Sequence, residues 1–421
     1  MTDSNEPTFV IVGASLAGAK AAETLRSAGH RGRVLLIGEE IDPPYERPPL
    51  SKGYLLGTQE RDAAFVHEPS WYAEHDVELL LGRRVTGLDR DRHEVLVDGV
   101  DRVGYDKLLL ATGCRVRPLP VPGMGLAGVR QLRTLAEAEE LLPALRPGTQ
   151  VVIIGSGWIG LEVAAAARQR DCRVTVVGRG ALPLRRVLGD ELGAVYRDLH
   201  AAHGVEFRFD VEVTEFGSLD ERRLSHVVLD DRTELPADLV LVAVGVRPNV
   251  ELAEAAGLPV DDGVVTDAAL RTADPDVYAC GDVAAFHHPL LDARIRVEHW
   301  ANALHGGPAA ARSMLGQQVS HDPLPYFFSD QYDLGMEYAG WVPPDGYDRV
   351  VFRGDPTVRP GGAPEFLAFW VRDGRVLAGM NANVWDVQDD IQVLVRAGWA
   401  GHRVDLDRLA DPGTPLAKLA G

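Results

Sequence analysis

The chain has 421 residues, with 43 basic and 62 acidic side chains and a formal net charge of −19. Such an acidic chain excludes binding to nucleic acid or to anionic membranes over a broad surface. The hydrophobic fraction of 46% suffices for sizeable buried cores, and the length predicts two to three domains.

The N-terminal residues and the cysteines indicate the compartment. No basic segment precedes the first apolar run, and no run of about 18 apolar residues occurs. Cys114, Cys172 and Cys280 lie far apart and form neither a CxxC pair nor a metal-ligand spacing. We therefore expect a cytoplasmic protein with no membrane span, no bound metal and three reduced, buried thiols.

An internal repeat is the most informative feature of the chain. Residues 9–39 and residues 151–179 each read as an apolar strand, a glycine-rich turn, an alanine-rich helix and a second apolar strand. This pattern predicts two βαβ units with parallel strands, and hence an α/β fold with two Rossmann-like domains.

Each predicted turn has the spacing of a dinucleotide-binding fingerprint, although a serine replaces the middle glycine of the first. The residues are Gly13, Ser15 and Gly18 in the first turn and Gly155, Gly157 and Gly160 in the second. Each turn opens a helix, whose N-terminal amides and dipole suit a pyrophosphate. Two such turns in matching frames are a much stronger indication than one.

The remaining elements follow in chain order. Short strands that lead into glycines are predicted within 105–113, 237–249 and 272–282. A helix is predicted at 297–316. Residues 365–381 predict a β-hairpin with an Asp373–Gly374 turn, and residues 386–398 predict a helix. The pattern after residue 324 therefore indicates a separate α+β domain.

Several sequence blocks together resemble one enzyme family. They are "VIVGASLAGA", "PYERPPLSK", "LLLATG", "VVIIGSGWIGLEVAAAARQR", "VAVGVRPN", "YACGD", "EHWANA" and "PYFFSDQYDLGMEY". In this order they resemble the FAD-dependent NAD(P)H reductases that serve ferredoxins, rubredoxins and putidaredoxin. The resemblance implies three domains: an FAD domain (1–113 and 246–323), an NAD(P)H domain (114–245) and a C-terminal α+β domain (324–421).

The resemblance also implies an FAD site. Gly13, Ser15 and Gly18 would hold the pyrophosphate, and Glu39, 21 residues after Gly18, would accept hydrogen bonds from the ribose, with Glu40 as the alternative. Further residues expected at FAD are Arg47 for a phosphate, Thr112 in "LLLATG", Asp282 for the ribityl hydroxyls, and Glu298, His299 and Trp300 in "EHWANA". A structural role is the default for His299.

Lys52 and Glu162 are the expected catalytic residues. In the family that the chain resembles, a lysine at the "PPLSK" position pairs with the glutamate of "GLE" close to flavin N5. A cation there favours hydride acceptance. The alternative is a surface glutamate and an unrelated lysine.

The second fingerprint would bind the nicotinamide cofactor. Gly178 stands where NADH-using members of the family have Glu, and Arg179 and Arg185 follow with a spacing that resembles a pair of 2′-phosphate-binding arginines. Gly160 argues the other way, because alanine is common there in NADPH enzymes. We expect NADPH, or both NADPH and NADH, over strict NADH; the alternative is that both arginines are solvated.

The implied function is hydride transfer from NAD(P)H to FAD, followed by single-electron transfer to a ferredoxin-type iron–sulfur protein, commonly one that feeds a cytochrome P450. The sequence leaves open an NAD(P)H-sensing flavoprotein of the apoptosis-inducing-factor type and an NAD(P)H oxidase. Thiol chemistry is disfavoured because no cysteine follows the second FAD strand. We also expect a local basic patch from Arg294, Arg296 and Arg312 for an acidic ferredoxin.

Overall fold

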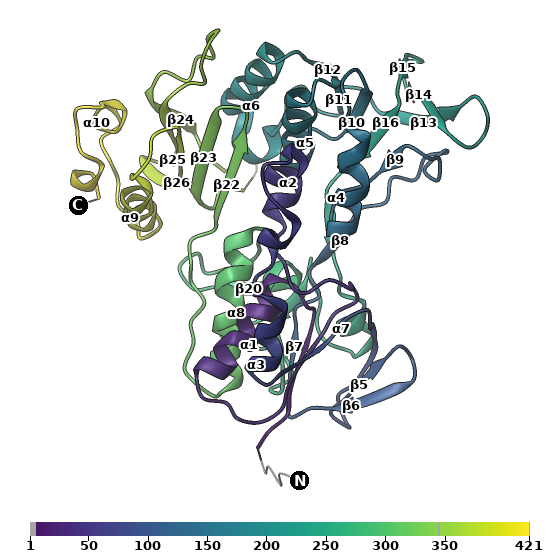
Figure 1. Ribbon diagram of the computed structural model, residues 1–421. Coiled ribbons are helices and arrows are strands. Elements are labelled where there is room, and N and C mark those ends of the chain that lie inside the picture. Colours follow the sequence, from purple (N-terminus) through teal and green to yellow (C-terminus); the bar gives the residue numbers. More distant parts are fainter. Residues whose placement is uncertain (1–5, 344–345, 421) are drawn as a thin grey trace. The chain divides into compact units, whose positions relative to one another are not determined.

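The computed structural model, drawn in Figure 1, describes residues 6–343 and 346–420. It divides into two units, and each contains a five-stranded parallel sheet. The first unit comprises Met1–Glu46, Arg61–Arg115 and Arg247–Pro325. The second comprises Arg47–Glu60, Val116–Val246 and Tyr326–Gly421. The expected NAD(P)H and C-terminal domains therefore fall within one unit, together with residues 47–60.

The parallel sheet of the first unit has the strand order β19-β7-β1-β2-β3. Its strands are β1 (Phe9–Val12), β2 (Val34–Ile37), β3 (Val77–Leu80), β7 (Lys107–Leu110) and β19 (Val277–Ala279). All five run parallel, and their apolar side chains are largely buried. Two three-stranded sheets also belong to this unit: β4 (Val85–Asp89), β5 (Glu94–Val97) and β6 (Asp101–Gly104), and β18 (Val264–Thr266), β20 (Ala284–His288) and β21 (Ala293–Arg296).

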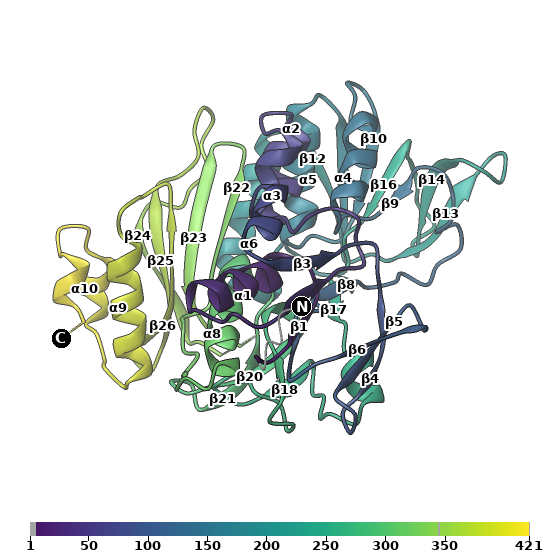
Figure 2. The same ribbon diagram turned by 60° about the horizontal axis from the view of Figure 1, so that its bottom comes forward.

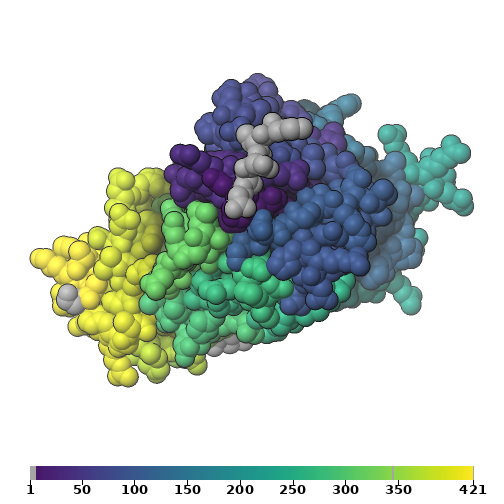
Figure 3. All heavy atoms as spheres, turned by 90° about the horizontal axis from the view of Figure 1, so that it is seen from below, coloured from purple at the N-terminus to yellow at the C-terminus, as the bar shows by residue number. Residues whose placement is uncertain are grey.

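Two helices of the first unit, α1 (Leu16–Ser27) and α8 (Trp300–Met314), pack tightly against each other. Figure 3 shows the purple residues of α1 beside the green residues of α8. A Cβ atom at Gly307 of α8 would come within 2.3 Å of the Ala17 carbonyl oxygen, so glycine permits this close approach. The strand and helix predicted at 272–282 and 297–316 are confirmed as β19 and α8.

The second unit repeats the same supersecondary pattern. Its parallel sheet has the order β12-β11-β10-β16-β9, and α5 connects β10 to β11. The elements are β9 (Val129–Arg130), β10 (Gln150–Ile154), α5 (Trp158–Gln169), β11 (Arg173–Gly178), α6 (Arg185–Ala202), β12 (Val205–Phe209) and β16 (Leu239–Val242). The two predicted βαβ units are therefore confirmed, and the fold class is α/β as expected.

The C-terminal part of the second unit is an antiparallel sheet with a helix on it (Figure 2). The elements are β22 (Tyr326–Gln331), β23 (Leu334–Gly340), β24 (Arg349–Gly354), β25 (Phe366–Arg372), β26 (Arg375–Ala382) and α9 (Gln388–Trp399). The predicted hairpin is confirmed: Asp373 (φ 51°) and Gly374 (φ 74°) form the turn between β25 and β26. The predicted helix is confirmed as α9.

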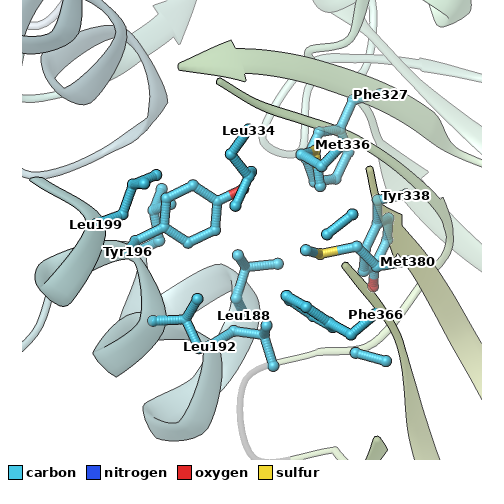
Figure 4. Packing of buried hydrophobic residues seen from close by; sticks show 14 of the residues in the cluster. Leu188, Leu192, Tyr196, Leu199, Phe327, Leu334, Met336, Tyr338, Phe366 and Met380 are labelled. Atoms are coloured by element: carbon cyan, nitrogen blue, oxygen red, sulfur yellow. The ribbon is translucent and has the colours of Figure 1, made fainter. Parts of the chain in front are cut away.

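One apolar core joins α6 to the C-terminal sheet within the second unit (Figure 4). Leu188, Leu192 and Tyr196 of α6 are buried against side chains of β22, β23 and β25. The fully buried Trp370 also donates its indole N–H to the Leu188 carbonyl at 3.1 Å. This packing determines which residues of β22 meet α5 and α6. Among the helices of the described residues, none has the length and apolar character needed to cross a membrane.

Candidate functional site

The first fingerprint turn closes tightly on the end of β7. Gly13 has φ +122°, and a Cβ atom there would lie 2.1 Å from the Ala111 carbonyl oxygen. A Cβ atom at Gly18 would lie 2.1 Å from the Gly13 carbonyl oxygen. Ser15 caps α1 without a side-chain hydrogen bond, and the first turn of α1 has no acidic residue. The turn thus presents helix N-terminal amides to an anion, which fits a pyrophosphate.

The second fingerprint turn has the same geometry. Gly155 has φ +112°, and a Cβ atom there would lie 2.3 Å from the Ala243 carbonyl oxygen. A Cβ atom at Gly160 would lie 2.2 Å from the Gly155 carbonyl oxygen, whereas no described atom lies within 4 Å of the corresponding position at Gly157. No acidic residue occupies the first turn of α5. This turn also fits a pyrophosphate, and Gly157 leaves room for its approach.

Four predicted FAD residues lie at one edge of the first sheet. Gly13, Glu39, Thr112 and Asp282 follow β1, β2, β7 and β19, which are neighbours in that sheet. The carboxyl ends of parallel strands are where α/β sheets bind their ligands. The Thr112 hydroxyl donates to the Asn249 carbonyl at 2.9 Å, so this side chain also braces a neighbouring loop.

The two candidate ribose acids differ in their surroundings. Glu39 is exposed and lies 3.6 Å from Arg84 in an ion pair. Glu40 is half-buried and accepts a hydrogen bond from the Tyr45 hydroxyl at 2.5 Å. The exposed Glu39 carboxylate is therefore the more accessible of the two.

The "EHWANA" block begins α8. His299 is the N-cap residue and Trp300 is the first residue of the helix. Glu298 accepts a hydrogen bond from the Arg296 guanidinium at 2.6 Å. Asn302 of the same block donates to the Val297 carbonyl at 2.8 Å, which fixes the chain direction into the helix.

The structure brings Lys52 and Glu162 together. The Lys52 Nζ lies 2.8 Å from Glu162 Oε1, and the two side chains are 14% and 4% exposed. Lys52 stands between a short 3-10 helix, η1 (Pro48–Ser51), and α2 (Gly53–Leu56), whereas Glu162 is on α5. The Ser51 hydroxyl donates to the second carboxylate oxygen. The Ser329 hydroxyl donates to Glu162 Oε1 at 2.7 Å. A buried carboxylate therefore has three donors, as its burial requires.

Comparison with known proteins identifies the family. Residues 7–307 match the model of the pyridine nucleotide-disulphide oxidoreductases, and residues 326–420 match that of the reductase C-terminal domain. The chain belongs to the pyridine nucleotide-disulphide oxidoreductase family. The chain is similar to putidaredoxin reductase of Pseudomonas putida, to which it is 40% identical over 88% of this chain and 87% of that protein.

Other relatives match along nearly their full length. The ferredoxin–NAD(+) reductase component of the anthranilate 1,2-dioxygenase system of Burkholderia cepacia is 38% identical over 97% of this chain and 98% of that protein. The reductase in the crystal structure of a covalent putidaredoxin reductase–putidaredoxin complex superimposes with a TM-score of 0.92. It is 37% identical and covers 99% of this chain and 98% of its own. The chain is therefore an oxidoreductase that uses FAD and a pyridine nucleotide.

This oxidoreductase lacks the redox-active cysteines that the family description suggests. Cys114, Cys172 and Cys280 are buried, as predicted, and none of them forms a disulfide among the described residues. Burial raises the pKa of Cys280 to about 12 and also raises the pKa of Cys172. Because the thiolate is the reactive form, Cys172 and Cys280 are poor nucleophiles.

The arginines expected at the nucleotides lie in different surroundings. Arg47 donates to the Arg133 carbonyl. Arg179 is exposed at the end of β11, directly after Gly178. Arg185 begins α6 and forms an exposed ion pair with Asp190. Only Arg179 of the expected 2′-phosphate pair is thus shown without a carboxylate partner among the described residues.

The prediction that Arg296 contributes to a basic surface patch is wrong. This side chain is 10% exposed and lies between Glu298, at 2.6 Å, and Asp262, at 3.3 Å. Arg294 is exposed but pairs with Asp261 at 3.2 Å. Nearby carboxylates therefore compensate both charges, which the count of basic residues could not reveal.

Sequence reasoning missed the polar residues beside the Lys52–Glu162 pair. Ser51 and Ser329 donate to Glu162, and Gln331 and His200 continue the hydrogen-bonded chain. Ser329 and Gln331 lie within the "PYFFSDQYD" block, so the unusual polarity of that predicted strand was the available signal. Nothing in the sequence pairs His200 with that strand.

Proposed function

We propose that this enzyme moves electrons from NADPH or NADH, through FAD, to a ferredoxin-type iron–sulfur protein. Bound FAD would supply the chemistry that accepts a hydride and releases single electrons. The names of the relatives support the partner: ferredoxin–NAD(+) reductase components and putidaredoxin reductase. One structural neighbour is the ferredoxin reductase for a cytochrome P450 system, which supports a P450 as the final acceptor. The reduced thiols suit the cytoplasm.

Two glycine turns would hold the two cofactors. The Gly13 turn would bind the FAD pyrophosphate, with Glu39 at the ribose, Thr112 and Asp282 at the same sheet edge, and Arg47 at a phosphate. The Glu298, His299 and Trp300 block would place the α8 N-terminus at the flavin ring, where its dipole would favour a developing negative charge. Gly155, Gly157 and Gly160 would bind the pyridine nucleotide.

The buried Lys52–Glu162 pair is the single observation that carries the proposal. The Glu162 carboxylate, 2.8 Å away, offsets part of the desolvation cost of placing the Lys52 ammonium at a site where its side chain is 14% exposed. The three donors on Glu162 fix that carboxylate, and Glu162 in turn fixes the position of the ammonium group. Lys52 would thereby present a fixed positive charge where hydride acceptance needs one.

The nucleotide preference would be NADPH, or both cofactors. Gly178 has no carboxylate that would repel a 2′-phosphate, and the exposed Arg179 directly follows Gly178. Arg185 could contribute only by exchanging Asp190 for the phosphate, because it pairs with Asp190. One relative, from Sphingomonas, is named a ferredoxin–NAD(P)(+) reductase, whereas several others are named for NAD(+) alone.

Two assays test the function. Anaerobic addition of NADPH or NADH should bleach the flavin absorbance, and cytochrome c reduction should depend on added ferredoxin. Rapid oxygen consumption and peroxide release without ferredoxin would instead indicate an oxidase. A preference for NADH of more than tenfold in kcat/KM would contradict the proposed nucleotide use.

A further inference from the structure

A continuous chain of hydrogen bonds runs from the Lys52–Glu162 pair to His200 on α6 and on to Tyr332. Ser329 donates to Glu162 Oε1 at 2.7 Å, and the Gln331 amide nitrogen donates to Ser329 Oγ at 3.0 Å. The Gln331 amide oxygen lies 2.7 Å from His200 Nε2. His200 Nδ1 lies 3.4 Å from the Tyr332 hydroxyl. His200, Ser329 and Gln331 are at most 1% exposed, so water cannot replace these bonds at low cost.

The carboxylate determines the direction of every bond in this chain. An ionised carboxylate only accepts, so Ser329 must give Glu162 its one hydroxyl proton. The Ser329 oxygen can then only accept from Gln331, which turns the Gln331 carbonyl toward His200. His200 must therefore carry its proton on Nε2 and leave Nδ1 to accept from Tyr332. This reasoning fixes the Gln331 orientation and the His200 tautomer from chemistry alone.

We propose that His200 is a positioning residue for the reaction: through Gln331 and Ser329 it holds the Glu162 oxygen that in turn holds Lys52. Oε1 of Glu162 receives both the Lys52 ammonium and the Ser329 hydroxyl. Aligned hydrogen bonds polarise one another, so loss of the His200 donor weakens the bond from Ser329. The reductase C-terminal segment thus orders the pair through β22. The inference rests on the proposed role of the Lys52–Glu162 pair.

The His200 tautomer tests the geometry without any measurement of activity. In ¹H–¹⁵N spectra of the holoenzyme's imidazole rings, assigned by the signal lost in His200→Gln, we expect protonated Nε2 and unprotonated Nδ1. The double variant Lys52→Met/Glu162→Leu, called the apolar-pair variant, removes the acceptor that orients the chain. There Ser329 can donate to Gln331 instead, and an Nδ1–H population should appear. A wild-type Nδ1–H tautomer, or an unchanged tautomer in the apolar-pair variant, would overturn the proposal.

Stopped-flow flavin reduction tests the function of the chain. His200→Phe removes the donor and should slow reduction roughly tenfold, as expected for a lost hydrogen bond in a charged network. His200→Gln retains an N–H near the Nε2 position and should restore the rate to within about threefold. His203→Phe is the control: the His203 ring bonds to the Leu199 carbonyl and stacks on Tyr332, and phenylalanine retains the stacking. Its rate should match that of the wild type.

A double-mutant cycle separates this inference from the proposed function. In the apolar-pair background, His200→Phe should change the rate less than twofold, because the group on which it acts is gone. An equal effect in both backgrounds would mean that His200 acts only through the fold, which overturns the inference. If the apolar-pair variant itself reduces flavin at the wild-type rate, the role of the pair fails instead.

Discussion

Replacing Lys52 with methionine removes the positive charge and retains most of the side-chain volume. The Lys52 ammonium lies 2.8 Å from Glu162, and both groups are largely buried. At an effective dielectric constant of about 20, their attraction is roughly 6 kcal/mol. Desolvation offsets part of this, and breaking a buried pair typically costs about 3–5 kcal/mol of stability. Ser51 and Ser329 still donate to Glu162, so we expect the lower end of that range.

The larger expected effect of Lys52→Met is on flavin reduction. Loss of one preorganised electrostatic contact in an active site typically slows the chemical step about 10²–10³-fold. We expect reduction by NADPH or NADH to slow about 100-fold, which corresponds to about 2.7 kcal/mol in the activation free energy. Nucleotide affinity should change much less, because the Gly155 turn is untouched.

Anaerobic stopped-flow absorbance of the FAD-loaded variant measures this rate. Lys107→Met is a matched control, because this substitution also breaks a lysine–carboxylate pair, in which Lys107 Nζ lies 2.6 Å from Asp276. Its flavin should be reduced at close to the wild-type rate. If Lys52→Met remains folded and its flavin is reduced within twofold of the wild-type rate, the electrostatic role of the pair is refuted.

Three further outcomes are expected. Gly13→Ala should yield protein with little bound flavin, because the new Cβ atom meets the Ala111 carbonyl oxygen at 2.1 Å; the ratio of flavin to protein absorbance measures this. Gly29→Ala, at another positive φ but with no neighbour within 4 Å, should keep its flavin. Gly178→Glu should lower kcat/KM for NADPH more than tenfold relative to NADH, and an unchanged ratio would count against the assigned site. The new Cβ atom would lie 2.9 Å from Ser156 Oγ, so the Ser156 side chain must rotate to accommodate it. Burial lowers the pKa of His200 from 6.5 to about 4, so the unfolded chain binds a proton that the native chain does not as the pH falls below 6.5. His200 should therefore lower the free energy of unfolding by about 2 kcal/mol as the pH falls from 7 to 5. Urea unfolding of His200→Phe should lack that part of the pH dependence, and equal pH slopes for the wild type and the variant would contradict this reasoning.

The sequence by itself determined the local elements of this protein. The glycine turns, the two βαβ units, the hairpin at Asp373–Gly374 and α9 all depend on residues within about 30 positions of one another. Periodicity and turn chemistry act over such distances, so these elements could be predicted. The wide spacing of the three cysteines, and the absence of a cysteine after the second FAD strand, also disfavoured thiol chemistry.

Only the tertiary structure decided which side chains meet. Gly13 is constrained by Ala111, at the end of another strand, and Glu162 is held by Ser51 and Ser329, which are 111 and 167 residues away. His200 meets Gln331 because α6 packs against the C-terminal sheet in one apolar core. Arg296 loses its expected surface role because the fold places Asp262 beside it. Burial and charge compensation arise from packing, and for that reason no local pattern in the chain records them.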